Sequence, residues 1–239
     1  MSKIIEVGPA ILIHGDCREI IPQIDQDVSP IGAVLTDPPY GVEYTGGHFH
    51  SGDVNIKRER KAIANDDRDV FDWAIPLILD HCPGPCYTFF ADSLAGNLYR
   101  AIDQSKADIH ALLIWHKING TYAAMNAQYK QRHEPILYFK RRGGHTRWAG
   151  SSTESTILNF PREPQNIFHP AQKPIGLLSH LIENHDQALI WLDPFMGSGS
   201  TVVAALRAGR SAIGIESDRE HFETAVMRAE SEYSQGKLF

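Results

Sequence analysis

The 239-residue sequence has few cysteines, no long apolar run and no excess of basic charge. Its three cysteines, Cys17, Cys82 and Cys86, are too few and odd in number for a disulfide framework, which favours a reducing, cytoplasmic location. No apolar run approaches the ~20 residues that a membrane-spanning helix needs, and we expect no signal peptide. Lys and Arg total 23 against 29 Asp and Glu, a net charge of −6. This balance argues against a protein that coats nucleic acid, although a local basic patch remains compatible with it.

Short apolar runs alternate with helical spans, which predicts an α/β sheet in one domain that covers residues 1–239. Several of the runs are apolar at every position, as expected of strands covered by helices on both faces. The expected strands are 10–14, 33–36, 86–90, 111–115, 135–139, 188–192 and 211–215. The expected helices are 71–80, 93–105, 174–186, 200–208 and 218–233, with Pro174 as the first residue of its helix.

Two stretches interrupt this alternation. Residues 41–70 are Gly-rich and then highly charged, which predicts a mobile loop, and residues 140–173 contain several Gly and Pro with little periodicity. Long irregular segments inside a compact domain are usually functional or disordered. Both follow expected strands, so both are placed to overhang one edge of the sheet.

The turn Asp37-Pro38-Pro39-Tyr40 follows the apolar run that ends at Thr36. Ligands of open α/β sheets bind beyond the carboxyl ends of the strands, where this turn would lie. The prolines leave carbonyls that only accept hydrogen bonds, Asp37 adds a carboxylate, and Tyr40 adds a flat aromatic face. Such a cluster complements an amino group on a planar ring. An ordinary proline turn with a capping aspartate is the alternative interpretation.

Residues 192–201 form a glycine turn between an expected strand and an expected helix. Gly197 and Gly199 permit the close backbone approach of a nucleotide-binding turn, and Glu216 ends the next strand, where it can accept hydrogen bonds from a ribose. The third glycine of the dinucleotide fingerprint and the P-loop pattern are both missing, which suits a nucleoside without phosphates. A nicotinamide oxidoreductase is the alternative. The cofactor candidates in the turn are Asp193, Phe195, Gly197, Ser198, Gly199, Ser200 and Thr201.

Two further segments carry polar residues next to expected elements. His169 and Lys173 precede the helix that leads to the glycine turn, and a lysine at a helix start opposes the helix dipole, so it could instead pair with a ligand carboxylate. Asp16 and Cys17 follow the first strand and are further candidates for cofactor contact. Asp16 either caps the next segment or accepts a hydrogen bond from an adenine amino group.

Basic residues cluster in both irregular stretches and are candidates for phosphate contact, although charge runs are more often solvated faces. These candidates are Lys57, Arg58, Arg132, Arg141, Arg142 and Arg147. The histidines and cysteines do not match the spacing of a metal site, so no metal is expected.

Together these motifs resemble the β-class S-adenosylmethionine-dependent amino-methyltransferases that modify DNA. The turn 37–40 is similar to the catalytic motif of that family, the segment 193–201 to its cofactor motif, and 169–174 to the segment that contacts the methionine part. The resemblance implies a Rossmann-like class I methyltransferase fold with a seven-stranded, mostly parallel sheet. The catalytic motif precedes the cofactor motif, which implies a circular permutation that places strand 10–14 beside strand 211–215 and Asp16 beside the cofactor adenine.

The resemblance also implies a reaction: S-adenosylmethionine donates its methyl group to the N6 amino group of a flipped adenine in double-stranded DNA. Aspartate rather than serine at position 37 favours adenine within that family. Cytosine N4 and adenine in RNA are the alternatives, and a cofactor-binding module without catalysis is another. Expected partners are DNA, a second copy of the chain and a cognate restriction endonuclease. The short segment 140–173 is the expected target-recognition insert, which a second subunit could complement.

Overall fold

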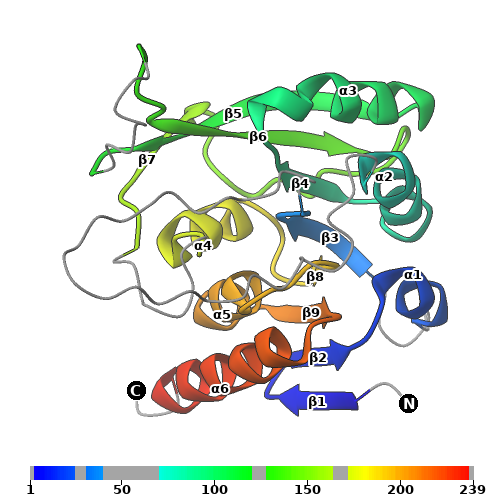
Figure 1. Cartoon of the computed structure of the whole chain (residues 1–239), viewed down its shortest axis with the longest axis vertical. Helices are drawn as coiled ribbons and strands as arrows, with labels where there is room; N and C mark the ends of the chain where they lie inside the picture. The colour runs from blue at the N-terminus through cyan, green and yellow to red at the C-terminus, as the bar shows by residue number, and fades with distance from the viewer. Residues whose placement is uncertain (1–2, 25–30, 40–69, 120–127, 164–171, 237–239) are drawn as a thin grey trace, which may run out of the picture.

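The computed structural model describes residues 3–24, 31–39, 70–119, 128–163 and 172–236. Within these residues nine strands form one sheet in the order β1-β2-β9-β8-β3-β4-β6-β5-β7 (Figure 1). The strands are β1 (Lys3–Val7), β2 (Ala10–His14), β3 (Ile31–Thr36), β4 (Pro85–Phe89), β5 (Asp108–Lys117), β6 (His133–Lys140), β7 (Ile157–Phe160), β8 (Ile190–Asp193) and β9 (Ser211–Glu216).

All seven expected strands are present, and β1 and β7 extend the sheet at its two edges. Both additional strands are short and half exposed, so they lack the continuous apolar run that identified the others. β7 lies inside the stretch 140–173, which is therefore not wholly irregular. Residues 40–69 lie outside the described residues, and with them nearly all of the loop expected at 41–70.

The permutation expected from the motif order is present in the sheet. β2 lies parallel to β9, with Ala10 opposite Ala212 and His14 opposite Glu216. The backbone N–H of Gly15 donates to the carbonyl of Glu216 at 2.9 Å, which extends the pairing one residue beyond the strand. β2, the first parallel strand in the chain, thus lies next to β9, the last one.

Helices cover both faces of the sheet (Figure 1). The helices on one face are α1 (Cys17–Ile20), α2 (Val70–His81) and α3 (Ala95–Gln104); those on the other are α4 (Ile175–Glu183), α5 (Ser200–Arg207) and α6 (Arg219–Gly236). Short 3-10 helices, η1 (Ile21–Gln23) and η2 (Asp92–Leu94), precede or follow them. Pro174 is the residue before α4 and has an extended ψ of 127°, so the expectation that it opens the helix is wrong by one residue.

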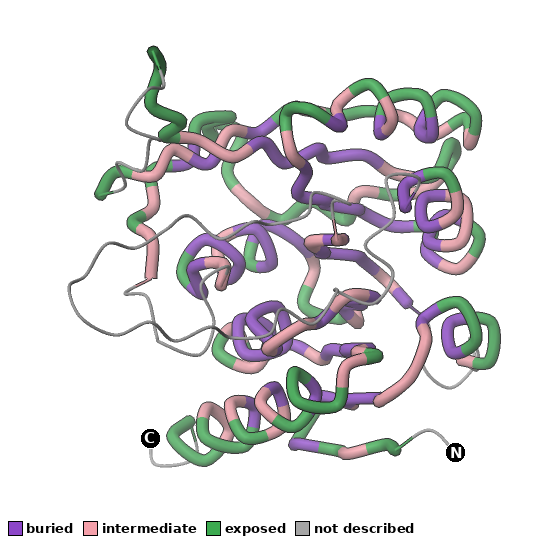
Figure 2. The backbone as a smooth tube through the Cα atoms, viewed as in Figure 1, coloured by how far each residue is buried: buried purple, intermediate pink, exposed green. Residues whose placement is uncertain are grey.

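Two hydrophobic layers sandwich the central strands, whose residues are buried almost throughout (Figure 2). Leu35 and Trp191 point toward α4, α5 and α6, whereas Val34 and Leu192 point toward α1, α2 and α3. Successive side chains of a strand face opposite ways, so a strand covered on both faces must be apolar at every position. Each large side chain buried in this way contributes roughly 1.5–3 kcal/mol.

The direction of each strand decides which residues meet at each edge. β2, β9, β8, β3 and β4 are mutually parallel and end at one edge, here named the carboxyl edge. β6 is antiparallel to β4 and to β5, so β6 begins at the carboxyl edge while β5 ends there. Residues before β6 and after β5 therefore lie beside the turns that follow β3 and β8.

None of the helices that the structure describes is both long and apolar enough to cross a membrane. Cys17, Cys82 and Cys86 are buried and carry no disulfide.

Candidate active site

The turn at 37–39 and the glycine turn begin on neighbouring strands. Thr36 ends β3 and Asp193 ends β8, and the Thr36 hydroxyl donates a hydrogen bond of 2.8 Å to Asp193 Oδ1. The same carboxylate oxygen accepts from the backbone N–H of Phe195 at 3.1 Å. Asp193 thereby fixes the start of both turns relative to each other.

Asp193 is buried, which raises the pKa of its carboxyl to about 6, although hydrogen bonds from Thr201, Thr36 and the Phe195 N–H act in the opposite direction. Thr201 is buried as well. The sequence predicts that Asp193 and Thr201 contact a cofactor. In the structure their buried side chains hydrogen-bond to each other, and Asp193 also binds Thr36 and the Phe195 N–H at the start of the two turns.

The glycine turn depends on backbone conformations that other residues rarely adopt. Gly197 has φ +54° and Gly199 has φ +83°. A Cβ on Gly199 would lie 2.8 Å from the Cβ of Ala225 in α6, so any side chain there would collide with that helix. A Cβ on Gly197 would meet no heavy atom of the described residues within 4 Å. The turn is therefore closed toward α6 at Gly199 and open at Gly197.

Glu216, at the end of β9, holds the other side of this turn. Its carboxylate accepts from the backbone N–H of Gly197 at 2.8 Å and from that of Asp218 at 2.7 Å. A carboxylate has about four acceptor positions, and the described residues fill two of them, so two remain for a ligand. The expected ribose-binding residue is thus at the glycine turn and already oriented by it.

Arg228 of α6 reaches the same turn, and sequence reasoning missed it. Its Nη1 donates to the carbonyl of Ser198 at 2.6 Å and to the Ser198 and Ser200 hydroxyls at 2.9 and 3.4 Å. Burial lowers the pKa of Arg228, and the nearby Glu163 and Glu232 raise it. The hydroxyls expected to bind a cofactor are held by α6. Arg228 lies about one helical turn after Ala225, which packs on Gly199, and this spacing is the signal by which the sequence could have identified it.

Asp16 lies at the carboxyl edge, directly after β2, and caps α1. It accepts from the backbone N–H of Arg18 at 2.9 Å, and its carboxylate pairs with the Arg18 guanidinium, which lowers the pKa of Asp16. That guanidinium lies 5.3 Å from the Trp73 ring, and Trp73 contacts the ring of Phe195 edge-on at 5.7 Å. Residues from α1, α2 and the glycine turn thus form one wall.

Cys17 is directed into the layer between the sheet and α1–α3. Burial raises the pKa of its thiol to about 12, so the thiol stays protonated at neutral pH. Its expected contact with a cofactor stays a prediction.

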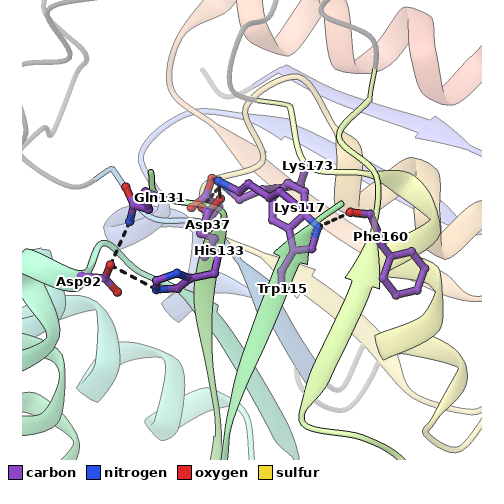
Figure 3. A network of polar contacts seen from close by, with 9 residues as sticks. Asp37, Asp92, Trp115, Lys117, Gln131, His133, Phe160 and Lys173 are labelled. Carbon is purple, nitrogen blue, oxygen red and sulfur yellow. Dashed lines mark hydrogen bonds and ion pairs between the residues drawn. The ribbon is translucent and has the colours of Figure 1, made fainter. Parts of the chain in front are cut away.

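Asp37 belongs to a row of alternating charges at the carboxyl edge (Figure 3). Lys173 Nζ pairs with Asp37 Oδ2 and, at 2.9 Å, with Glu134 Oε1. Lys117 Nζ pairs with the other oxygen of Glu134 at 2.9 Å. The side chains of Lys173, Lys117 and Glu134 are only 11, 14 and 16% exposed. Four distant parts of the chain converge here because β5, β6 and β3 share this edge.

The pairing favours the ionised forms of Lys173 and Glu134. Burial alone would lower the pKa of Lys173, but the Asp37 and Glu134 carboxylates outweigh burial and hold it above its ordinary value. Burial would raise the pKa of Glu134, and Lys173 and Lys117 together hold it well below its ordinary range. Lys173 also lies 5.0 Å from the centre of the Phe89 ring, whose face attracts a cation.

Lys173 has two partners that the sequence did not predict, because the structure pairs it with two carboxylates of the protein itself. Its expected pairing with a ligand carboxylate stays a prediction. Sequence reasoning missed Glu134 and Lys117, although each is a charged residue at the end of an apolar strand. Tyr40 and His169 lie outside the described residues.

A second polar group borders the row. Asp92, in η2 after β4, accepts from Gln131 Nε2 at 2.9 Å and lies 3.5 Å from His133 Nε2. Figure 3 shows these three side chains beside Asp37, and His133 and Asp92 are about half exposed. The carboxyl edge therefore combines a buried charge row with accessible polar groups.

The sequence profile of the DNA methylase family matches residues 31–227, which include Asp37, the charge row and the glycine turn. The chain belongs to the N6/N4 DNA methylase family.

Known relatives support the same assignment. This DNA methylase is 25% identical over 244 residues to the type II methyltransferase M2.DpnII of Streptococcus pneumoniae, covering 93% of this chain and 90% of the relative.

Solved structures identify the fold. The M1.HpyAVI–SAM complex aligns with a TM-score of 0.68 at 24% identity and covers 91% of this chain and 97% of the other. The cytosine-N4-specific PvuII DNA methyltransferase aligns with a TM-score of 0.68 at 16% identity, over 95 and 92% of the two chains. The fold of this DNA methylase is accordingly the Rossmann-like class I methyltransferase fold.

The basic residues expected to contact DNA do not all lie on the catalytic side of this methylase. Arg141 and Arg142 follow β6, and because β6 is antiparallel to β4 they lie at the edge opposite Asp37. Arg147 lies at that opposite edge too, where it pairs with Asp186 at 3.3 Å. The expectation that these three accompany the catalytic turn is wrong. Arg132 precedes β6 and lies at the carboxyl edge; Lys57 and Arg58 are outside the described residues.

Proposed function

We propose that this DNA methylase transfers a methyl group from S-adenosylmethionine to the N6 amino group of adenine in double-stranded DNA. The observation that carries the proposal is the position of Asp37 directly beside the glycine turn, through the hydrogen bond between Thr36 and Asp193. An acceptor for an amine and a turn for a nucleoside thus share one edge of the sheet.

The residues at the glycine turn suit a nucleoside that carries a sulfonium. The turn is open at Gly197, Glu216 has acceptor positions for ribose hydroxyls, and Phe195 offers an aromatic face. Asp16 follows the strand next to β9, and we propose that it accepts a hydrogen bond from the adenine amino group. When bound, S-adenosylmethionine supplies an electrophilic methyl group. The structure of M1.HpyAVI, a complex with SAM, is consistent with this choice.

The chemistry required of the protein is to hold the target amine. The lone pair of an aromatic amino group is delocalised into the ring, so the nitrogen is a weak nucleophile. Hydrogen bonds from its two N–H groups to Asp37 and to the Pro38 carbonyl draw the nitrogen toward tetrahedral geometry and localise the lone pair. A hydrogen bond to a charged group contributes roughly 1.5–3 kcal/mol, enough to fix the orientation of the amine.

Methyl transfer then needs no covalent enzyme intermediate. The nitrogen–carbon bond forms as the carbon–sulfur bond breaks, the electron pair stays on sulfur, and the surplus proton on nitrogen passes to water. The adenine must leave the duplex first, which costs a few kcal/mol that stacking on Tyr40 partly offsets. Arg132, Lys57 and Arg58 are the proposed phosphate contacts, and 140–173 is the proposed target-recognition segment.

Adenine is preferred to cytosine because an aspartate occupies position 37. Cytosine N4 is the second candidate, supported by the fold shared with the cytosine-N4-specific PvuII enzyme. The similarity to a type II methyltransferase supports a cognate restriction endonuclease as partner, and we extend the proposal to a cytoplasmic enzyme that acts in a restriction–modification pair and forms homodimers.

The test is transfer of tritium from methyl-labelled S-adenosylmethionine to unmethylated double-stranded DNA, with the modified nucleoside identified by mass spectrometry. We expect N6-methyladenine from the wild type and at least a hundredfold less from Asp37→Ala. N4-methylcytosine would select the second candidate. An Asp37→Ala variant with full activity would refute the role of Asp37, and label found only in RNA would refute the DNA substrate.

A further inference from the structure

The row formed by Lys117, Glu134, Lys173 and Asp37 contains more buried charge than the proposed reaction requires. A carboxylate that only accepts hydrogen bonds could stand alone at a wet edge, yet Asp37 is paired with a lysine that is 11% exposed. Burying an ammonium group is costly unless it is paired and hydrogen-bonded. The burial of Lys173 therefore serves either the reaction or only the stability of the fold, as an ordinary structural ion cluster would.

We infer that Lys173 is a positioning residue for methyl transfer: held by Glu134, it fixes the Asp37 carboxylate in the ionised, acceptor-only form that the target amine requires. The inference rests on the proposed function and adds to it a residue that acts through Asp37 rather than on the cofactor.

The geometry of Lys173 supports this role. An ammonium group has three donors, and those of Lys173 are directed at Asp37, at Glu134 and toward the face of Phe89. Its position is thus determined from three sides, by the loop after β3, by β6 and by β4. Asp37 Oδ2 is in turn held at a fixed place relative to the sheet.

Glu134 and Lys117 complete the charge balance. Among the ion pairs of the row, Lys173 has Asp37 and Glu134 as partners, so the loss of Glu134 would leave it with one of them. Glu134 has Lys173 and Lys117 as partners, so the loss of Lys117 would leave this buried carboxylate with one of them. Among the described residues, the charged and titratable groups around Asp37 are Lys173, with Glu134 and Lys117 behind it, Asp193 on β8, which is a like charge, and the half-exposed pair of Asp92 and His133. Lys173 is the cation that counters the repulsion between Asp37 and Asp193.

The chemical consequence concerns the acid form of Asp37. A protonated carboxyl presents a hydrogen to the amine, so it would lose the acceptor role on that oxygen. A cation next to a carboxylate favours the ionised form. Lys173 therefore extends the pH range in which Asp37 can accept hydrogen bonds from the amine.

The variants are Lys173→Met, Lys173→Arg and Glu134→Gln, with Lys140→Met as the matched control. Lys140 is 12% exposed, pairs with Asp108 at 2.8 Å and belongs to the same strand as Glu134, but it lies at the opposite edge of the sheet. Thermal melting of each variant, with and without S-adenosylmethionine, identifies any that fails to fold.

The first measurement is the pH profile of kcat together with KM for S-adenosylmethionine. In Lys173→Met we expect kcat at pH 7 to fall at least tenfold and the acidic limb of the profile to move up by about one pH unit or more, because one unit is a tenfold change in protonation. KM should change less than about threefold. Lys173→Arg should restore most of kcat, Glu134→Gln should shift the limb in the same direction, and Lys140→Met should leave the profile unchanged.

A raised KM with unchanged kcat in Lys173→Met would overturn the inference, because it would assign Lys173 to the cofactor carboxylate. An unshifted acidic limb, or an equal loss in Lys140→Met, would overturn it as well and leave a structural ion cluster.

The second measurement does not depend on activity. In protein labelled with carbon-13 at aspartate carboxyls, the Asp37 resonance is identified as the one absent from Asp37→Asn and titrated by NMR. A midpoint at least one pH unit higher in Lys173→Met than in the wild type supports the inference; an unchanged midpoint overturns it even in an active enzyme. A wild type that methylates no DNA overturns the proposed function instead, and the catalytic role of the row with it.

Discussion

The hydroxyl of Thr36 donates a hydrogen bond of 2.8 Å to the carboxylate of Asp193, a residue 157 positions later in the chain. Both side chains are buried. Each residue ends a strand and begins a turn, so this contact fixes the two turns relative to each other. In the proposed function one turn holds the target amine and the other the cofactor, and this hydrogen bond then sets their separation.

Replacing Thr36 by Val removes this hydrogen bond while it keeps the shape of the side chain. The Asp193 carboxylate then loses one donor in a buried place, so we expect the free energy of unfolding to fall by roughly 1–3 kcal/mol. Urea denaturation measures it. Thr88→Val in β4 is the matched control, because Thr88 is equally buried but donates to the neighbouring Phe89 carbonyl at 3.2 Å. Equal losses in both variants would contradict a special role for the Thr36–Asp193 contact.

Arg228 links α6 to the glycine turn, so its removal should loosen the turn. In Arg228→Met, the Ser198 carbonyl and two serine hydroxyls lose their donor, and we expect the affinity for S-adenosylmethionine to fall about tenfold, equivalent to ~1.4 kcal/mol. Isothermal titration calorimetry measures the affinity directly. Arg219→Met, an exposed residue of α6 that pairs with Glu223, is the control. Unchanged affinity in Arg228→Met would show that α6 does not hold the turn in its binding conformation.

His185 occupies a buried aromatic site at the edge opposite Asp37. Its Nδ1 lies 2.6 Å from the Thr146 carbonyl, so Nδ1 carries the hydrogen, and its Nε2 accepts from the Tyr87 hydroxyl at 2.8 Å. The surrounding rings are Tyr87, Tyr138, Trp148 and Trp191. Burial lowers the pKa of His185 to about 4, so the native protein holds a neutral imidazole at neutral pH.

This burial predicts loss of stability in mild acid. The unfolded chain takes up the proton near pH 6.5, its ordinary value, and the native protein only near pH 4. Between these limits the unfolded state binds more protons, so the free energy of unfolding falls as the pH falls from 6.5 toward 4, by about 3 kcal/mol at most.

Denaturant titrations between pH 7 and pH 4 measure this slope. We expect His185→Gln to be less stable at pH 7, because it disrupts the aromatic site, but to lose less stability on acidification. His221→Gln replaces an exposed histidine of α6 and serves as the comparison. A slope reduced equally in the two variants would refute the assignment to His185.

Local patterns in the sequence identified the sheet well. Strands such as β8 and β9 are apolar at nearly every position because helices cover both faces, and that signal does not depend on distant residues. β1 and β7 escaped detection because edge strands are half exposed and short. The glycines at 197 and 199 were likewise identifiable, since a left-handed φ selects glycine wherever it occurs.

Partners of charged side chains were less predictable. Lys173 was expected beside a ligand because its helix could not explain it, and the explanation lies 39 and 136 residues away, in Glu134 and Asp37. Arg141, Arg142 and Arg147 were expected on the catalytic side because they follow a strand. An antiparallel strand ends at the opposite edge of the sheet, and the residues of β6 alone do not show in which direction it runs.

By itself the sequence determined the strands that helices cover, the two turns and their order along the chain, because apolar periodicity, glycine and proline act on the backbone within a few residues. Only the tertiary structure decided which turns face each other, which edge each charged residue reaches and which carboxylate each lysine neutralises. These depend on strand order and direction, and long-range pairing is selected by the packing of the whole sheet rather than by any one segment.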